Sequence, residues 1–281
     1  MVDHFIQAGV IGWPIAHSRS PIIHRYWLKE LGIAGDYKPI AVSPEEIEPF
    51  FQQFPSSGLK GANVTIPHKE VALSACHDVN NVARKIGAVN TVWLEDERLL
   101  GTNTDAYGFT ANMDDRAPGW NLNPGAAIIL GAGGASRAII WSLLSSGFDP
   151  IHIVNRTVSR GQVLADQFGP RVRAHEWNEI GSLLPSASLL VNSTSLGMKG
   201  QDPLAIDLAS LPDTAVVADI VYVPLKTDLL RRAESRGLQT VDGLGMLLHQ
   251  AVPGFERWFG KRPVVTENLR KLILTDLGEP S

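Results

Sequence analysis

Residues 126–137 read AAIILGAGGASR, and this stretch decides the fold. The first five residues are all apolar, which is typical of a central parallel strand that is buried on both faces. Gly131 follows this strand, and Gly133 lets the backbone approach a pyrophosphate. Ser136 or Arg137 is expected to open a helix whose first turn offers free N–H groups and a positive dipole. The order of strand, glycine-rich turn and helix predicts a dinucleotide-binding unit.

One position departs from the G-x-G-x-x-G pattern of such loops. The third glycine would fall at position 136, which is Ser136, and Gly134 is an additional glycine. An ordinary strand-to-helix turn is the alternative interpretation. We expect a cofactor to contact the loop formed by Gly131, Ala132, Gly133, Gly134 and Ala135.

Outward from this loop, strand and helix patterns alternate along the chain. In the second half, strands are expected at 151–155, 188–192 and 216–222, and helices at 138–147 and 164–168. In the first half, strands are expected at 7–11, 35–41 and 61–66, two more strands joined by an acidic turn within 88–105, and helices from Pro21 to Gly32 and from a Ser43 cap onward. This alternation predicts an α/β protein with mainly parallel sheets.

Length and composition narrow the class of protein. A chain of 281 residues suggests two domains, and its 25 basic against 29 acidic side chains leave a formal charge of −4. The surplus positive charge that nucleic-acid binding needs is missing, so no nucleic-acid partner is expected. Asp3 and His4 stand where a signal peptide has a basic region, and no apolar run reaches the ~20 residues of a membrane span. Cys76, the single cysteine, indicates a reducing compartment. We expect a soluble cytoplasmic protein without membrane contact.

The strand at 151–155 is expected to end over the ribose of the cofactor. An NAD enzyme carries an acidic residue there, but this sequence has Asn155, Arg156, Thr157 and then Arg160. Two guanidiniums and a hydroxyl suit a 2′-phosphate, which predicts NADP as the cofactor. The alternative is that both arginines are merely solvated surface charges.

Lys69 and Asp105 are the candidate catalytic residues. Lys69 starts the element after the strand of NVTIPHK, and Asp105 ends GTNTD, which we interpret as another strand terminus. Open α/β sheets build their sites at the carboxyl ends of strands. An ammonium and a carboxylate that meet in a cleft would form a proton-handling pair. The alternative for Lys69 is an ordinary solvated lysine.

Other sequence signals are weaker. Tyr222 and Lys226 have the Tyr-x-x-x-Lys spacing of short-chain dehydrogenases, but Pro224 would break the helix that this motif requires. The histidines form no metal-binding motif, so His24 and His68 are interpreted as structural and no metal is expected.

The segment 244–259 has apolar residues close to helical spacing. Pro253 is expected to kink or divide this helix. Gln250 is a polar residue on this otherwise apolar segment and calls for a functional explanation.

Eight motifs together resemble the shikimate dehydrogenase family, in its NADP-dependent biosynthetic form. In chain order they are GWPIAHSRSP, GANVTIPHK, GAVNT, NTDAYGF, GAGGASR, NRTVSR, NSTSLGM and DGLGMLLHQA. The resemblance implies a substrate-binding α/β domain over 1–105, completed by C-terminal helices in 244–281. A Rossmann-like NADP-binding domain would occupy 106–243.

The same resemblance implies an oxidoreductase that reversibly reduces 3-dehydroshikimate to shikimate with NADPH, in aromatic amino acid (chorismate) biosynthesis. Lys69 and Asp105 would handle the proton. The residues implied in substrate binding are Ser18, Ser20, Thr65, Asn90, Tyr222 and Gln250. The further residues implied near the cofactor are Thr194, Ser195, Ile220, Gly243 and Met246.

Two other functions stay open at this point. One is a quinate/shikimate dehydrogenase that prefers NAD, although Arg156 argues against it. The other is a catalytically silent NADP-binding regulator of the same fold, although both Lys69 and Asp105 are present. The expected partner is a small-molecule substrate, and the sequence does not decide between a monomer and a homodimer.

Overall fold

The structure is a computed structural model that describes residues 5–279. Asp3 and His4, on which the signal-peptide argument relied, lie outside this range. The chain forms two compact units. The first runs to Thr104 and includes Leu248–Asp276, and the second comprises Asp105–Leu247 and resumes at Leu277. The chain returns to the first unit at Leu248, a few residues after the predicted domain boundary at residue 243.

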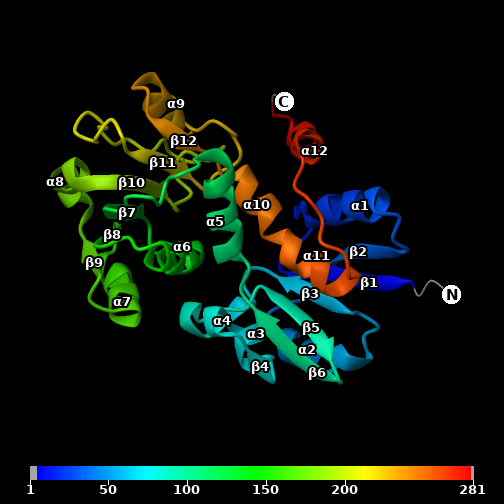
Figure 1. Cartoon of the computed structure of the whole chain (residues 1–281). Helices are drawn as coiled ribbons and strands as arrows, with labels where there is room; N and C mark the ends of the chain where they lie inside the picture. Colours follow the sequence, from blue (N-terminus) through cyan, green and yellow to red (C-terminus); the bar gives the residue numbers. More distant parts are fainter. Residues whose placement is uncertain (1–4, 280–281) are drawn as a thin grey trace. The chain divides into compact units, whose positions relative to one another are not determined.

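The first unit is built on a six-stranded sheet with helices on both faces (Figure 1). Its elements are β1 (Ile6–Gly12), α1 (Ser20–Glu30), β2 (Gly35–Ala41), α2 (Ile47–Gln52), the 3₁₀ turn η1 (Phe54–Ser56), β3 (Gly61–Val64), α3 (Lys69–Ala75), β4 (Asp78–Val79), α4 (Asn81–Ile86), β5 (Thr91–Glu95), β6 (Arg98–Thr102), α11 (Ala251–Phe259) and most of α12 (Glu267–Leu277).

The strand order in this sheet is β2-β1-β3-β5-β6-β4, and β5 is antiparallel to β3 and β6. Asp96 and Glu97 join β5 to β6 with φ values of 49° and 61°, the left-handed conformation that tight hairpin turns require. Such a short turn can join only antiparallel strands. The sheet is therefore mixed, and the predicted parallel order holds for β1, β2 and β3.

Two cores cover the two faces of the first sheet. On one face, α2, α3 and α4 pack over an aliphatic and phenylalanine core that includes Phe51, Phe54 and Val89. On the other face, α1 and α11 bring together an aromatic cluster. Its members are His24, Trp27, Tyr37, Phe255 and Trp258.

The second unit contains an all-parallel six-stranded sheet. Its elements are α5 (Asp105–Arg116), β7 (Ala126–Leu130), α6 (Gly134–Ser145), β8 (Ile151–Val154), α7 (Val158–Phe168), β9 (Val172–His175), η2 (Trp177–Glu179), α8 (Ile180–Leu183), η3 (Leu184–Ser186), β10 (Ala187–Asn192), β11 (Val216–Asp219), α9 (Asp228–Ser235), β12 (Gln239–Val241) and α10 (Leu244–His249), whose last residues belong to the first unit.

The strand order is β12-β11-β10-β7-β8-β9. From β7 the chain first adds β8 and β9 on one side and then β10, β11 and β12 on the other, so β7 lies between β10 and β8. Helices α5, α6 and α7 cover one face of this sheet. The other face is covered by α8, α9 and the connection between β10 and β11, which buries four apolar side chains: Leu204, Ile206, Leu208 and Leu211. This confirms the predicted Rossmann-like layering.

Two predicted helix starts were wrong. Helix α2 begins at Ile47 instead of directly after a Ser43 cap. The Ser43 hydroxyl donates to the Glu46 carboxylate (3.1 Å) within a turn that precedes the helix. The helix after the glycine loop begins at Gly134 instead of at Ser136 or Arg137. Its N-cap, Gly133, is already extended.

Two predicted strand ends were also wrong. The strand expected over 216–222 ends at Asp219, where a buried carboxylate turns the chain. Asp105 is the first residue of helix α5, and the preceding strand β6 already ends at Thr102.

Pro253 does divide the C-terminal helical segment, as predicted. Helix α10 ends at His249 and α11 begins at Ala251, which puts Pro253 in the first turn of α11. Proline is tolerated there because an N–H in the first turn has no acceptor within the helix, and because no preceding turn of the same helix offers a carbonyl that its ring would clash with. Within residues 5–279, no helix is long and apolar enough to cross a membrane.

Gly61 allows α11 to contact the first sheet. A Cβ at this position would lie 2.0 Å from Trp258 Nε1 and 2.4 Å from the Val92 carbonyl oxygen, the two atoms joined by a 3.0 Å hydrogen bond. We expect Gly61→Ala to lower the free energy of unfolding by at least ~2 kcal/mol, because it overpacks the contact and breaks this bond. Urea titration measures the change.

The matched control is Gly181→Ala in α8, where a Cβ would meet no atom within 4 Å. This substitution should be neutral or stabilising by up to ~1 kcal/mol. An equal loss of stability in both variants would contradict the packing argument.

His24 should make the first unit sensitive to acid. Its ring is fully buried and stacks on Tyr37 at 3.8 Å, and burial lowers its pKa to about 3. The unfolded chain takes up a proton below about pH 6.5 and the folded chain does not, so the stability contribution of His24 is lost as pH falls. When the pH is lowered from 7.5 to 4.5, the free energy of unfolding of His24→Phe should rise by roughly 3 kcal/mol relative to that of wild type.

Urea titrations of the wild type and this variant at both pH values provide the measurement. The exposed His17 supplies the control, because His17→Gln should shift the stability gap little. If the difference in free energy of unfolding between wild type and His24→Phe does not change with pH, the prediction is refuted.

Candidate active site

Four predicted site residues of the first unit lie in two neighbouring loops or at the helix starts that follow them. Ser18 and Ser20 follow β1, while Thr65 and Lys69 follow β3. The two strands pair in parallel, so their carboxyl ends lie side by side. Ser20 is buried, and its backbone N–H donates to the Ser18 hydroxyl (3.3 Å), which fixes the start of α1.

Gly12 lets these loops approach each other. A Cβ at Gly12 would lie 2.6 Å from Thr65 Cγ2, closer than any real contact. The Thr65 N–H donates to the Ile11 carbonyl (2.9 Å), and the Trp13 N–H donates to the Ile66 carbonyl (3.1 Å). The predicted Thr65 is therefore held against the end of β1.

Asn90 belongs to a buried polar network at the same end of the sheet. Its Oδ1 accepts the Thr104 N–H (2.7 Å) and the Thr91 hydroxyl (3.0 Å). Asn63 Nδ2 donates to Thr91 Oγ1 (3.0 Å), and the Tyr37 hydroxyl donates to Asn63 Oδ1 (2.7 Å). This network fixes Asn90 and Thr104, the residue before Asp105.

Lys69 is the first residue of α3 and is half-buried. Its carbonyl accepts the Val89 N–H (2.9 Å), and the Asn90 carbonyl accepts the Val64 N–H (2.8 Å). These bonds bring the start of α3, the end of β3 and Asn90 together within the first unit.

The remaining predicted residues for substrate and proton transfer lie elsewhere. Gln250 is half-buried at the N-cap of α11 in the first unit. Asp105 and Tyr222 belong to the second unit. Asp105 begins α5, and Tyr222 lies in the loop after β11.

In the second unit, the glycine loop leaves β7 next to the end of β10. Gly131 has φ +102°, and a Cβ there would lie 2.9 Å from Thr194 Cγ2. The Ser136 hydroxyl accepts the Gly133 N–H (3.0 Å), donates to the Gly131 carbonyl (3.1 Å) and lies 2.8 Å from Ser193 Oγ. The residue that replaces the third glycine therefore holds the loop together.

The predicted phosphate-binding residues follow β8. Asn155 Nδ2 donates to the Thr157 carbonyl (2.7 Å), which shapes the turn into α7. Arg156 and Arg160 are exposed, and within residues 5–279 neither guanidinium forms an ion pair. Two cationic groups without an acidic neighbour at a strand end can bind a dianion.

A pocket of about 290 Å³ lies between the loops after β10 and β11. Three predicted cofactor residues, Thr194, Ser195 and Ile220, line it together with Tyr222. Its other lining residues are Ser193, Met198, Val221 and Val223, which the sequence analysis did not identify. Gly243 supports the pocket from behind, because a Cβ there would lie 2.2 Å from the Ile220 carbonyl oxygen. Met246 packs partly buried against the core of the same unit.

Asp219 ends β11 beneath this pocket and is 1% exposed. Its Oδ1 accepts the Asn192 side-chain amide (2.9 Å) and the Val221 N–H (3.0 Å), and its Oδ2 accepts the Thr227 hydroxyl (2.7 Å). Burial raises the pKa of this carboxyl to about 6, although the three donors act in the opposite direction. Asp219 was not among the predicted site residues, yet a lone charge in the apolar run VVADIVY was a usable signal.

Cys76 and His68 lie outside the predicted site, and both are at least partly buried. Burial raises the pKa of the Cys76 thiol to about 12, which makes a reactive thiolate unfavourable. His68 is buried, and its Nε2 lies 2.8 Å from the Val42 carbonyl oxygen. In the part of the chain that the structure describes, no three His, Cys, Asp or Glu side chains are grouped to hold a metal ion.

Three family models match this chain. Residues 10–92 match the shikimate dehydrogenase substrate binding domain, residues 115–221 match shikimate / quinate 5-dehydrogenase, and residues 243–266 match the shikimate 5′-dehydrogenase C-terminal domain. Among curated proteins, the chain is 56% identical over 271 residues to the shikimate dehydrogenase (NADP(+)) of Azorhizobium caulinodans, covering 96% of both chains.

Solved structures give the same result. Shikimate 5-dehydrogenase from Thermus thermophilus, in complex with NADP(H) and shikimate, matches with a TM-score of 0.85 and 33% identity over 97% of this chain and 100% of that chain. Quinate dehydrogenase from Corynebacterium glutamicum, in complex with NAD, matches with a TM-score of 0.88 and 30% identity over 96% of this chain and 99% of that chain. The chain belongs to the shikimate dehydrogenase family.

Proposed function

We propose that this protein is an NADP-dependent shikimate dehydrogenase, which reversibly reduces 3-dehydroshikimate to shikimate in the pathway to the aromatic amino acids. Membership of the family supports the reaction. The observation that carries the cofactor choice is the pair of exposed guanidiniums, Arg156 in the turn after β8 and Arg160 in the first turn of α7. An NAD-preferring quinate dehydrogenase would place a carboxylate there to accept the ribose hydroxyls.

The residues of the second unit fit a dinucleotide. A Cβ at Gly133 or Gly134 would meet no atom within 4 Å, so the backbone at the start of α6 is open to a pyrophosphate. The helix dipole and N–H groups at this start favour an anion. Arg156, Thr157 and Arg160 would hold the 2′-phosphate, and the pocket of Thr194, Ser195 and Ile220 would take the nicotinamide end.

The nicotinamide cofactor supplies the hydride when it is bound. The chain itself supplies orientation and the proton. Ser18 and Ser20 have hydroxyls suited to a carboxylate, with Tyr222 as a further donor. Thr65, Asn90 and Gln250 offer both donors and acceptors, as ring hydroxyls require.

Lys69 is the proposed proton donor to the oxygen that gains charge during reduction. An ammonium can donate a proton, and it also stabilises a developing alkoxide electrostatically. Asp105 is the proposed partner that supports this group. In the oxidation direction the same amine accepts the proton.

This proposal assigns the first unit, with the C-terminal helices from residue 244, to the substrate. It assigns residues 106–243 to NADP. The location of Ser18, Ser20, Thr65, Lys69 and Asn90 in adjoining loops and helix starts at one edge of the first sheet supports the first assignment. The all-parallel sheet with its glycine loop supports the second.

The cofactor preference can be tested with Arg156→Ala and Arg160→Ala. Each variant should lower kcat/KM for NADPH about tenfold or more and leave kcat/KM for NADH nearly unchanged, because a charge-assisted hydrogen bond to the 2′-phosphate is lost. Initial rates with both cofactors measure this. Arg171→Ala is the matched control, since this exposed arginine precedes β9 at the opposite end of the strands. A wild-type enzyme that prefers NADH would refute the NADP assignment.

The catalytic role of Lys69 can be tested with Lys69→Met. Loss of the group that accepts the hydroxyl proton should lower kcat by about 10²- to 10⁴-fold in shikimate oxidation, while NADPH still binds. Lys60→Met, an exposed lysine just before β3, should retain near-normal turnover. Near-normal kcat in Lys69→Met would remove this residue from the mechanism.

Asp105→Asn and the double variant test whether the two residues act on the same proton. If they do, the double variant should be little slower than Lys69→Met alone, because residues that act as a unit are not additive. Additive losses in kcat would show that Asp105 has a separate role.

A further inference from the structure

We propose that Asp219 is a positioning residue that keeps the pocket between the β10 and β11 loops in the shape that receives the nicotinamide end of the dinucleotide. This inference rests on the proposed function for the identity of the ligand. The geometry comes from the second unit alone.

The carboxylate of Asp219 connects three parts of the pocket. Oδ1 accepts from Asn192 at the end of β10 and from the Val221 N–H in the loop after β11. Oδ2 accepts from Thr227, the N-cap of α9, whose hydroxyl also caps the Leu230 N–H (3.4 Å). A single buried group therefore fixes both walls of the pocket and the helix behind them.

Asn192 carries this constraint into the first wall. Its Oδ1 accepts both the N–H (3.0 Å) and the hydroxyl (2.7 Å) of Thr194, and its Nδ2 also donates to the Leu196 carbonyl (3.1 Å). The Thr194 hydroxyl in turn accepts the Leu196 N–H (3.1 Å). The loop that carries Thr194 and Ser195 is thus shaped by one amide, and that amide is oriented by Asp219.

The network continues to the glycine loop. Ser193 Oγ donates to the Leu130 carbonyl at the end of β7 (2.6 Å) and lies 2.8 Å from Ser136 Oγ. Ser136 binds both Gly131 and Gly133. The two ends of the proposed dinucleotide site are therefore joined through Asn192 and Ser193 by short polar contacts.

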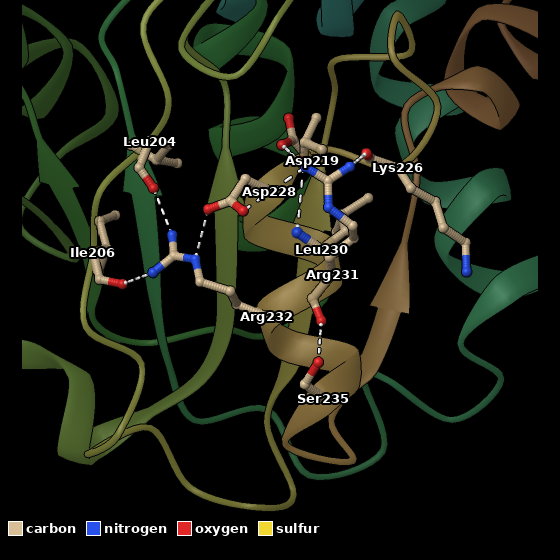
Figure 2. Close-up of polar contacts among 10 residues, drawn as sticks. Leu204, Ile206, Asp219, Lys226, Asp228, Leu230, Arg231, Arg232 and Ser235 are labelled. Carbon is tan, nitrogen blue, oxygen red and sulfur yellow. Dashed lines mark hydrogen bonds and ion pairs between the residues drawn. The ribbon is translucent and has the colours of Figure 1, made fainter.

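Helix α9 gives Asp219 a fixed support. Figure 2 shows Asp219 close to the start of α9, and Arg232 farther along the helix reaching the carbonyls of Leu204 and Ile206. Arg232 Nε also pairs with Asp228 (2.8 Å). One turn later, Arg236 binds the carbonyls of Leu208 and Leu211. These contacts hold the long β10–β11 connection against α9, so Thr227 offers a firm anchor.

Removing the carboxylate should allow the two loops that form the pocket to rearrange. In Asp219→Ala, the Asn192 amide, the Val221 N–H and the Thr227 hydroxyl would lose their shared acceptor in a buried site, and the loops would have to rearrange to find others. In Asp219→Asn, Oδ1 can still accept from Asn192 and Val221, and the new Nδ2 can donate to Thr227 Oγ1. Asp219→Asn should therefore keep the shape of the pocket.

The test is fluorescence titration of the purified full chain with NADPH in the absence of substrate. We expect Asp219→Ala to raise the dissociation constant about tenfold to a hundredfold, as three buried donors lose their acceptor. Asp219→Asn should stay within about threefold of wild type. Asn192→Ala should weaken binding in the same direction and provides a second variant if Asp219→Ala does not fold.

Two controls separate positioning from stability. Asp213→Asn removes another aspartate of the same unit, which is exposed and pairs with Arg236 (3.0 Å). Phe148→Leu weakens the core of the unit, where Phe148 stacks on Trp120. Both controls should bind NADPH as wild type does at a temperature well below their melting points. Equal weakening in Phe148→Leu would reduce Asp219 to a structural role and overturn the proposal.

A second measurement does not need the cofactor. Lys199 is exposed in the pocket loop, and its N–H donates to the Val223 carbonyl across the two walls (2.9 Å). Tryptic cleavage after Lys199 should be faster in Asp219→Ala than in wild type, Asp219→Asn or Phe148→Leu, because local opening exposes the loop. If wild type does not bind NADPH, the proposed function fails, and cleavage still tests Asp219. If neither affinity nor cleavage changes in Asp219→Ala, the positioning role is wrong.

Discussion

The hydrogen bond from Asn192 Nδ2 to Asp219 Oδ1 is the interaction that organises the pocket between the loops after β10 and β11. A buried carboxylate is costly unless several donors satisfy it, and that requirement dictates where the neighbouring chain must run. The donors come from the end of β10, from the loop after β11 and from the cap of α9. The burial that raises the pKa of Asp219 to about 6 is thus the cost of a site whose loops have little freedom.

In the first unit, the buried polar groups are neutral and satisfy one another by hydrogen bonds. Asn63, Asn90, Thr91 and Thr104 are all buried at the ends of β3, β5 and β6, and each is bonded to another member. A fully satisfied polar network specifies one arrangement, whereas an apolar contact of equal size tolerates several. Both units therefore place their most constrained polar groups at the edge of the sheet where the parallel strands end, next to the residues proposed to bind ligands.

Much of this arrangement could be predicted from local sequence. The run 126–137 has the strand, turn and helix that the structure shows, and the acidic turn at Asp96 and Glu97 is a hairpin as expected. Contacts between distant residues could not be predicted in the same way. Ser43 has the residue type of a cap, but its partner is the Glu46 side chain; the role of Asp219 depends on Asn192, 27 residues away. Periodicity and spacing report on neighbours in sequence, and these interactions are tertiary.

Ser136 shows how a departure from a motif can be compensated. The third glycine of a dinucleotide loop usually allows the helix to pack closely on the strand. A serine is the smallest residue that adds a hydroxyl, and here that hydroxyl is buried, bonded to Gly131 and Gly133, and 2.8 Å from Ser193 Oγ. The substitution therefore exchanges conformational freedom for two bonds within the loop and a close polar contact with the residue that follows β10. The glycine loop is in this way tied to the network of Asn192 and Asp219, and the motif and its exception belong to one site.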